Sequence, residues 1–471
     1  MNRGALTLGL AAALAGCMVG PDYLRPDAAV PDAYKEAGDW KLAQPRDGAS
    51  RGRWWEDFGD PQLNALIEQV EISNQTVLVA EAQFRQARAL VASSRAALYP
   101  ALDGSASIIR SRSPTGVIGG TTAGRVLTNR TASLDANWEA DLWGRVRRAV
   151  ESNEANALAS AADLAAARLS AQAELASDYF QLRILDAQKQ LIEDTVAAFQ
   201  KSLDLTKNRY DAGVAAKVDV VQAQTQLKST QADAIDLGVQ RAQLEHAIAV
   251  LIGKPPAALS LERVPLAISM PFIPFGLPSE LLERRPDIAA AERHVAGANA
   301  QIGVAKAAYF PSLSLSASGG FRSTDAAQWF TVPSRFWSIG PALAQSIFDA
   351  GLRRAQTDQA IAAYDATVAQ YRQAVLAGFQ EVEDNLAALR ILEEEAKVQE
   401  DAVRAARESV TLTLNQYKAG TVSFLNVAIV QTTLLNNERT AMGILGRRLV
   451  AAVTLVKALG GGWNASELAQ M

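Results

Sequence analysis

Two copies of one pattern follow each other along this chain, in the same order. Three pairs of segments carry the repeat: 95–100 with 306–311, 209–213 with 416–420, and, more loosely, 141–145 with 348–352. The first pair is offset by 211 residues and the other two by 207. Copies in one order indicate a duplicated structural unit, which constrains the architecture before any side-chain chemistry does. The change of four in the offset predicts that one loop between the markers differs in length.

The first seventeen residues predict export and lipid attachment. Arg3 precedes a short apolar run from Ala5 to Ala15, which is too short to span a bilayer and is typical of a signal peptide. The run ends on small residues before Cys17, the only cysteine among 471 residues, so no internal disulfide is expected. This ending resembles a bacterial lipobox, which implies a signal peptide at 1–16, a covalent lipid at Cys17 and, because Met18 follows, sorting to the outer membrane. The alternative is a buried, inert thiol.

Little in the rest of the sequence indicates catalysis or nucleic-acid binding. The net charge of −4 provides no basic surface for nucleic acid. His246 and His294 lie far apart without metal-ligand spacing, and no nucleotide-binding or nucleophile motif occurs. No run of eighteen apolar residues follows Cys17, so no transmembrane helix is expected. We therefore predict a protein that is not an enzyme and has no metal or cofactor apart from the lipid.

Long helices are expected to fill most of each copy. The stretch 145–212 contains no Gly or Pro, and the stretch 352–419 contains only Gly378. Both are rich in strong helix formers, with apolar residues at coiled-coil spacing. Each ends at a repeated Tyr-x-Ala-Gly, where Gly can adopt the left-handed conformation of a helix cap. Return helices should follow at 219–251 and 424–459. The result is two helical hairpins, with tips near 209–219 and 416–426.

Four segments alternate apolar and polar residues, as strands with two different faces do. Alternation is strict at 131–141 and 312–321 and weaker at 102–108 and 337–343. About ten alternating residues are typical of a transmembrane β-strand with one face in lipid and one in water. A half-buried strand of a soluble sandwich is the alternative. The expected strands and the loops facing outside are these: strands at about 101–110, 131–141, 312–321 and 336–345, and loops at 111–130 and 322–335.

Four strands cannot form a closed barrel alone. In lipid every backbone N–H and C=O must be paired, so an open sheet edge is not tolerated. Three chains with four strands each would close a twelve-stranded barrel, which makes a homotrimer the most economical assembly. The expected fold is an α+β membrane protein, in which the duplicated units form a trimeric β-barrel continued by a periplasmic α-helical barrel. Three acids on the polar face of the second strand either line the lumen and favour cations or are simply solvated: Asp135, Glu139 and Asp141.

Several segments resemble one known family. Residues 17–26 look like the mature start of bacterial outer membrane factors of the TolC-like superfamily, in the NodT/OprM lipoprotein group. Residues 282–288 resemble that group's Arg-Pro-Asp helix start, and 307–311 resemble its run into the third strand. The resemblance covers roughly 18–465. It implies a homotrimer in the outer membrane of a Gram-negative bacterium, acting as the passive exit duct of a tripartite efflux system. The implied partners are a periplasmic adaptor and an inner-membrane pump, most often of the resistance-nodulation-division type.

The predicted organisation of the chain follows from these segments. It consists of a signal peptide at 1–16, a lipidated N-terminal and equatorial segment at 17–60, a first repeat at 61–260, a connector at 261–278, a second repeat at 279–459 and a tail at 460–471.

Function should concentrate at the two hairpin tips, which lie farthest from the membrane anchor. The residues expected to close the tunnel or to contact the adaptor are Tyr210, Gly213, Lys217, Asp219, Tyr417, Gly420, Leu425 and Ile429. In the OprM-like group the second tip helix carries a Leu, then an acid, then a base, and the aligned positions here are Leu425, Ile429 and Thr432. An apolar constriction by Leu425 and Ile429 is therefore favoured over an acidic gate, with Lys217 and Asp219 as rim partners. Ordinary coiled-coil packing is the alternative.

Two other functions remain open on the sequence alone. A lipid-anchored periplasmic coiled-coil scaffold without a pore would explain the helices but not the amphipathic strands. A type I protein-secretion duct would share the architecture, although the lipobox and the Arg-Pro-Asp segment favour efflux. The transported compounds are not predicted, because a conduit leaves their selection to the pump.

Overall fold

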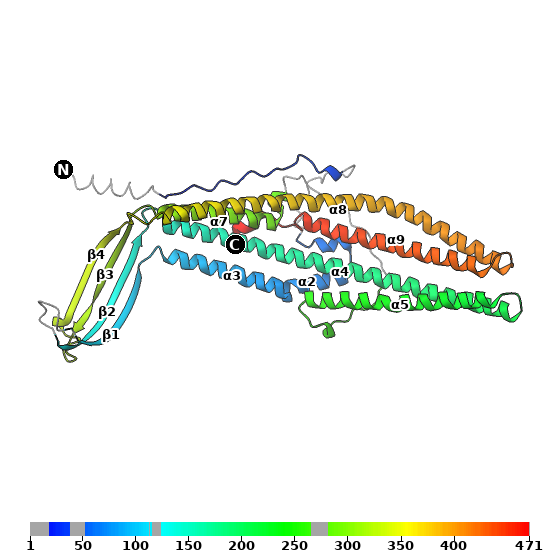
Figure 1. The fold of residues 1–471 in the computed structure, drawn as a ribbon, viewed down its shortest axis with the longest axis horizontal. Helices are drawn as coiled ribbons and strands as arrows, with labels where there is room; N and C mark the ends of the chain where they lie inside the picture. Colours follow the sequence, from blue (N-terminus) through cyan, green and yellow to red (C-terminus); the bar gives the residue numbers. More distant parts are fainter. Residues whose placement is uncertain (1–17, 38–51, 113, 115–123, 265–280, 471) are drawn as a thin grey trace. The chain divides into compact units, whose positions relative to one another are not determined.

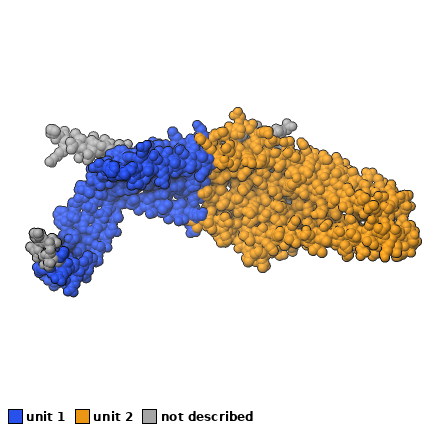
Figure 2. Space-filling view, viewed as in Figure 1, with its two compact units in different colours: residues 1–27, 83–160, 290–371 blue, residues 28–82, 161–289, 372–471 orange. Residues whose placement is uncertain are grey.

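A computed structural model describes residues 18–37, 52–112, 114, 124–264 and 281–470. Cys17, the signal peptide and parts of the predicted equatorial segment and connector lie outside these residues. The chain forms two compact units (Figure 2). Unit 1 comprises 1–27, 83–160 and 290–371, and unit 2 comprises 28–82, 161–289 and 372–471. Within the described part of the chain, no helix combines the length and apolar character needed to cross a membrane.

The long and return helices have equal lengths in the two halves (Figure 1). α4 (Arg145–Asp211) and α8 (Leu352–Lys418) each contain 67 residues. α5 (Lys217–Leu251) and α9 (Phe424–Ala458) each contain 35. At a rise of 1.5 Å per residue, each long helix extends for about 100 Å. The two predicted helical hairpins are present, and α5 begins two residues before the expected start.

Shorter helices precede the strands in each half. They are α2 (Pro61–Ser73) and α3 (Gln75–Ala96) in the first half, and α6 (Leu281–Arg284) and α7 (Pro286–Ala307) in the second. Asp60 caps α2, because its carboxylate accepts hydrogen bonds from the backbone N–H groups of Gln62 and Leu63. Short 3₁₀ turns lie at Lys35–Ala37, Trp54–Phe58, Pro256–Ala258, Val332–Ser334 and Ala465–Gln470.

The Arg-Pro-Asp segment has a structural role within unit 2. Pro286 is the first residue of α7, where its fixed φ suits a helix start. The buried Arg285 side chain forms ion pairs with Asp287 and Glu381, each at 2.7 Å. It also donates to the Ala458 carbonyl at the C-terminal end of α9, at 3.2 Å, where the helix dipole favours a cation. One guanidinium thus ties together α7, α8 and α9.

Unit 1 contains one antiparallel sheet in the order β1-β2-β3-β4. Its strands are β1 (Ala101–Arg112), β2 (Val126–Ala140), β3 (Ser312–Ser323) and β4 (Arg335–Ala344). Paired residues share a face, and the two faces differ sharply in polarity. One face presents exposed apolar side chains, including Leu102, Leu134, Trp337 and Ile339. The other carries Asp103, Ser105, Ser133, Asp135, Asn137, Ser316 and Ser318.

The strand boundaries depart from the sequence-based expectation in the second strand. β2 begins at Val126, five residues before the alternation indicates, because residues 126–130 continue the backbone pairing with β1 without alternating in polarity. β2 ends at Ala140, so Asp141 lies beyond the strand and not on its polar face. Backbone pairing sets both ends of β2, and at these ends the pairing is not accompanied by alternating side-chain polarity.

The prediction that one loop accounts for the change in repeat offset was wrong. The start of β1 lies 44 residues before the start of α4, and the start of β3 lies 40 residues before the start of α8. The difference is distributed over the hairpin loop, the second strand of the pair and the turn into the long helix. The long and return helices conserve their lengths.

Candidate functional site

Both hairpin tips, which lie in unit 2, end their long helix with the same backbone motif. In the first tip, Gly213 has φ = 74°, its N–H donates to the Tyr210 carbonyl, and the Val214 N–H donates to the Arg209 carbonyl, both at 2.8 Å. This is the Schellman motif, in which a left-handed residue lets the chain leave the helix. The second tip repeats both bonds at 3.0 Å: Gly420 (φ = 78°) to Tyr417 and Thr421 to Gln416. The repeated Tyr-x-Ala-Gly is therefore the helix stop.

The two tyrosines of this motif have different surroundings. Tyr417 is 3% exposed, whereas Tyr210 is 43% exposed. The Tyr417 ring packs edge-on against Phe424 with 5.7 Å between centroids, and its hydroxyl donates to Thr206 Oγ1 at 3.2 Å. Lys217 occupies the position in the first copy that Phe424 occupies in the second. The second tip is thus anchored by an aromatic pair that the first tip does not have.

A hydrophobic core beneath the tips draws on all four helices of the hairpins. Its buried members are Phe199, Leu203, Ala223, Leu227, Tyr417, Phe424 and Val427. Gln431 is buried beside this core and donates to Ser202 Oγ at 3.1 Å. Gln226 donates to Thr432 Oγ1 at 2.8 Å, so Thr432 serves as an acceptor between α5 and α9. The two hairpins therefore share one core in this part of unit 2.

Arg209 connects the two tips directly. Its guanidinium carbon lies 4.8 Å from the centroid of the Tyr417 ring. Its Nη1 donates to the Lys418 carbonyl at 3.1 Å, at the C-terminal end of α8. A cation is favoured both over an aromatic ring and at the end of a helix where carbonyl groups are exposed. We call this arrangement of Arg209, Tyr417 and Lys418 the tip clasp.

Leu425 and Ile429 lie outside the shared core. They are 49% and 53% exposed, whereas Phe424 and Val427 on the same turns of α9 are almost fully buried. One side of α9 therefore packs within the chain, and the other presents two large aliphatic side chains. Three valines of the first tip and the first turns of α5 are also more than half exposed: Val214, Val218 and Val221.

The two predicted rim residues lie on the first turn of α5. Lys217 is exposed and is the first residue of the helix. The Asp219 carboxylate accepts a hydrogen bond from the Ala216 N–H at 3.4 Å, in the manner of the acidic member of a capping box. Asp219 thus has a local role in starting α5.

The three acids near the second strand each have defined partners in unit 1. Asp135 accepts hydrogen bonds from Ser318 at 2.6 Å and Ser133 at 2.8 Å, which links β2 to β3 on the polar face. Glu139 forms a two-bond ion pair with Arg145, at 2.7 and 3.0 Å. Asp135 and Glu139 therefore lie on the face predicted to be polar, within a network of hydrogen bonds and ion pairs.

Asp141 caps the N-terminus of α4, because its carboxylate accepts from the backbone N–H groups of Val146 and Arg147 at 3.0 and 2.9 Å. Asp349 does the same for α8, accepting from the N–H groups of Gly351 and Arg353. The Arg353 side chain and these backbone bonds hold the pKa of Asp349 below its ordinary value, although desolvation acts in the opposite direction. An acid at each strand-to-helix turn is thus part of the duplicated unit.

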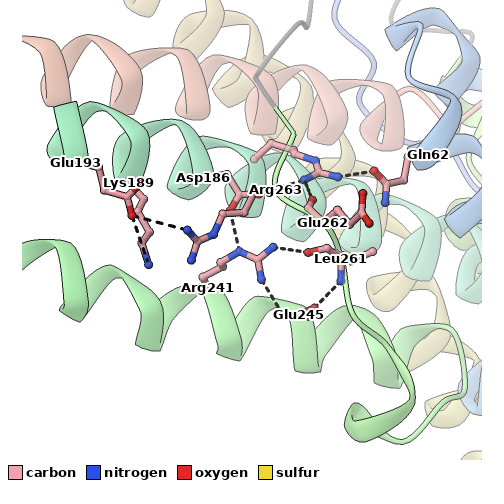
Figure 3. Close-up of polar contacts among 10 residues, drawn as sticks. Gln62, Asp186, Lys189, Glu193, Arg241, Glu245, Leu261, Glu262 and Arg263 are labelled. Carbon is pink, nitrogen blue, oxygen red and sulfur yellow. Dashed lines mark hydrogen bonds and ion pairs between the residues drawn. The ribbon is translucent and has the colours of Figure 1, made fainter.

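The start of the connector is held against α4 and α5 by buried charges (Figure 3). Asp186 on α4 pairs with Arg183 at 3.1 Å and with Arg241 at 2.7 Å. Arg241 donates to the Leu261 carbonyl at 2.6 Å, and Arg183 donates to the Glu262 carbonyl at 2.7 Å. The side chains of Arg183 and Asp186 are 3% and 2% exposed. These bonds fix the connector to one side of the first hairpin.

Among the described residues, no group of three or more His, Cys, Asp and Glu side chains is placed to hold a metal ion.

The sequence did not predict the roles of Arg209, Phe424 and Thr206, which together hold the Tyr417 side chain in place. A signal for Arg209 was available, because the residue before the repeated Tyr changes from Arg209 to Gln416 within an otherwise repeated motif. The contact across the two tips was not predictable from either copy alone.

The sequence profile described as "Outer membrane efflux protein" matches residues 66–254 and 277–461. The chain belongs to the outer membrane efflux protein family. It is 32% identical to the toluene efflux pump outer membrane protein TtgC of Pseudomonas putida, over 98% of this chain and 96% of TtgC. It is 30% identical to the cation efflux system protein CusC of Escherichia coli, over 97% and 98% of the two chains. The solved outer-membrane channel OprN superposes with a TM-score of 0.88 at 33% identity, covering 95% of this chain and all of OprN.

Membership of this family gives the function at the level of a class. The chain is an outer membrane efflux channel of a Gram-negative bacterium and extends into the periplasm. Its four-stranded sheet and paired helical hairpins are those of the TolC-like fold, as predicted. The alternative of a periplasmic scaffold without a pore is wrong.

Proposed function

We propose that three copies of this chain form one continuous exit duct. The observation that carries the proposal is the four-stranded sheet, whose outer strands β1 and β4 each pair on one side only within the described chain. Since lipid does not tolerate an open sheet edge, β1 of one copy would pair with β4 of the next. Three copies then close twelve strands, with the apolar face toward lipid and the polar face toward the lumen.

We further propose that a lipid on Cys17 anchors this duct in the outer membrane. The residues that follow Cys17 are fixed within unit 1, because the Val19 N–H donates to the Trp143 carbonyl at 3.0 Å. The buried Arg148 side chain donates to the Val19 carbonyl at 3.3 Å and to Asp22 at 2.8 Å. The first described residues are therefore held near the turn from β2 to α4, and the proposed lipid site precedes Val19 by two residues in the sequence. Mass spectrometry of the N-terminal peptide should find the acyl chains, and Cys17→Ala should abolish them.

The partners follow from the arrangement of the chain. The duct would work with a periplasmic adaptor and an inner-membrane pump, of the resistance-nodulation-division type, and would carry out no catalytic step itself. The tips 209–219 and 416–426 are the surface proposed for the adaptor, since they expose apolar side chains that a single chain leaves uncovered. Relatives of comparable identity are named for toluene and for cations. The pump, and not the duct, would then determine which compounds enter.

Closure at rest would be made by Leu425 and Ile429 of the three copies. Large aliphatic side chains around a three-fold axis can narrow a channel and exclude water from it. The exposure of both side chains in one chain, next to a well-packed core, supports this role. Tyr210, Lys217 and Asp219 would form the rim, whereas Gly213, Gly420 and Tyr417 hold the tips in shape.

The test of the assembly is the mass of the detergent-solubilised particle by light scattering, followed by conductance in planar bilayers. A trimer that inserts and conducts is expected. A monomer that is stable under mild extraction would contradict the closure of β1 on β4. A trimer without conductance would retain the barrel but contradict the open duct.

A further inference from the structure

Unit 2 contains a groove that none of the roles above uses. Its volume is about 1120 Å³, and residues of α4, α5, α8 and α9 line it. The volume is slightly above the range of about 300–1,000 Å³ that is typical of sites for drug-sized molecules. The groove lies beside the middle of α4 and α8 and the C-terminal halves of α5 and α9, well away from the residues that build the tips.

The lining of the groove suits a neutral amphipathic molecule. Ile184, Leu244 and Val450 contribute aliphatic surface, and Gln181, Gln240 and Asn385 contribute amide groups. The only charged residues in the lining, Glu395 and Arg447, neutralise each other, because Arg447 Nη2 lies 2.9 and 3.0 Å from the two oxygens of Glu395. A molecule with an apolar body and several hydrogen-bonding groups could satisfy such a lining, whereas an ion would find no uncompensated charge.

The groove opens on the side of the first hairpin that faces away from the connector. Arg183 of α4 donates to the Glu262 carbonyl of the connector. Asp186 of α4 pairs with Arg241, which donates to the Leu261 carbonyl of the connector (Figure 3). At 100° per residue, Ile184 and Gln188 point roughly opposite to both of these α4 residues on the same helix. In the proposed duct the connector would lie on the outside, so the opposite side of these helices would form the tunnel wall.

Two glycines of α9 shape the groove. A Cβ atom added at Gly446 would lie 3.1 Å from Ile184 Cγ1, so this glycine allows α9 and α4 to approach closely. A Cβ atom at Gly443 would meet nothing within 4 Å, although Gly443 lines the groove. Gly443 therefore opens onto empty space, where even a small side chain would project into the cavity.

We propose that this groove binds neutral amphipathic organic molecules on the wall of the duct. The placement on the tunnel wall rests on the proposed function, whereas the binding chemistry rests on the lining of the groove alone. Such a site would hold passing compounds weakly, and its preference for neutral molecules would act only on compounds that the pump has already admitted.

The test uses a thiol introduced into the groove of the full-length protein. The variant Gly443→Cys is labelled with a small neutral maleimide, with and without chloramphenicol, a neutral amphipathic probe. The matched control is Gly238→Cys on α5, because a Cβ there also meets nothing within 4 Å but the residue lies outside the groove. The unmodified protein gives the background, and its only cysteine is Cys17.

Chloramphenicol should slow labelling of Gly443→Cys in a saturable way and leave Gly238→Cys unchanged. At about twice the dissociation constant, two thirds of the grooves are occupied and the labelling rate falls about threefold. The anionic dye fluorescein at the same concentration should not protect. Equal slowing at both positions, or protection by the anion alone, would overturn the proposal.

Labelling of Gly443→Cys only after denaturation would also overturn it, because it would mean that another part of the assembly covers the groove. Light scattering of the same samples separates this proposal from the proposed function. A trimer without protection contradicts the groove alone, and protection in a particle that is not a trimer supports the groove while contradicting the duct.

Discussion

The guanidinium of Arg209 lies over the ring of Tyr417, 4.8 Å from its centroid, and so joins the ends of the two long helices. Each partner belongs to a different copy of the duplicated unit. The reverse contact, from the second copy to the tyrosine of the first, does not form. Gln416 replaces the arginine in the second copy, and the first-copy tyrosine, Tyr210, is exposed. Duplication has thus provided two similar tips, and divergence has provided the bond between them.

Removing the charge of the tip clasp should loosen the tips. Arg209→Met keeps an unbranched apolar stem but loses the cation–π contact and the bond to Lys418, which together contribute about 1–2 kcal/mol. We expect a lower midpoint of thermal unfolding and a higher single-channel conductance. Lys207→Met, at an exposed position on the same helix, is the control. Equal effects from the two variants would show that the clasp has no specific role.

The two equivalent tyrosines should respond differently to the same change. Tyr417→Phe removes a buried hydroxyl that donates to Thr206, and the loss should cost about 1 kcal/mol. Tyr210→Phe removes an exposed hydroxyl, and its effect should stay within about 0.5 kcal/mol. Denaturant unfolding of both variants in the same detergent measures the difference. Similar losses at the two positions would contradict the asymmetry of the tips.

Truncation of the proposed gate should affect permeability more than stability. Ile429→Ala removes a side chain that is 53% exposed, so the free energy of unfolding should change little. Single-channel conductance should rise, and cells carrying the variant should become more sensitive to vancomycin, a bulky antibiotic. Leu412→Ala, which removes a side chain 55% exposed on α8, is the matched control. If conductance and sensitivity do not change, Ile429 is not part of the closure.

The connector should detach when its buried acid is neutralised. Asp186→Asn leaves the largely buried Arg183 and Arg241 without their shared carboxylate. Breaking a buried ion pair from one side typically costs about 3–5 kcal/mol. Limited proteolysis around residues 254–264 should become faster, while Asp204→Asn, at an exposed position of α4, should have no effect. Unchanged proteolysis of Asp186→Asn would mean that other contacts hold the connector.

One acid of α4 should make stability depend on pH. Burial, with a contribution from nearby Glu174, raises the pKa of Asp178 from its ordinary value of 3.8 to about 6. The free-energy cost of ionising Asp178 in the folded state is therefore fully present above pH 6. It disappears as the pH falls below 3.8, the ordinary pKa of an aspartate, because the carboxyl is then protonated in both the folded and the unfolded state. Asp178→Asn should raise the unfolding midpoint at pH 7.5 and have little effect at pH 3.5. A gain of the same size at both pH values would exclude a titration effect.

The architecture was predictable because duplication and helix-breaking residues are directly visible in the sequence. Gly213 and Gly420 mark the helix stops, and the absence of Gly and Pro before them gives helices of the observed extent. The limits of β2 were not predictable in the same way, since residues 126–130 pair through the backbone without alternating in polarity. The tip site was only partly predictable. Alignment with related tips singles out Leu425 and Ile429, whose role in closure stays a prediction. The Arg209–Tyr417 contact depends on how two distant helix ends meet.

α4 and α8 have equal lengths, and so do α5 and α9. The two hairpins therefore extend equally far, and the two halves of the chain must keep this distance in common. Suppose that seven residues are deleted from one long helix and seven from its return helix. The tip of that hairpin would then end about 10 Å short of the other tip. Arg209 could then no longer reach the end of α8. The same deletion made in both halves would bring both ends back to one level. A change in how far the protein extends into the periplasm therefore has to occur in both copies at once. The two copies, which began as duplicates, must then continue to evolve together in helix length.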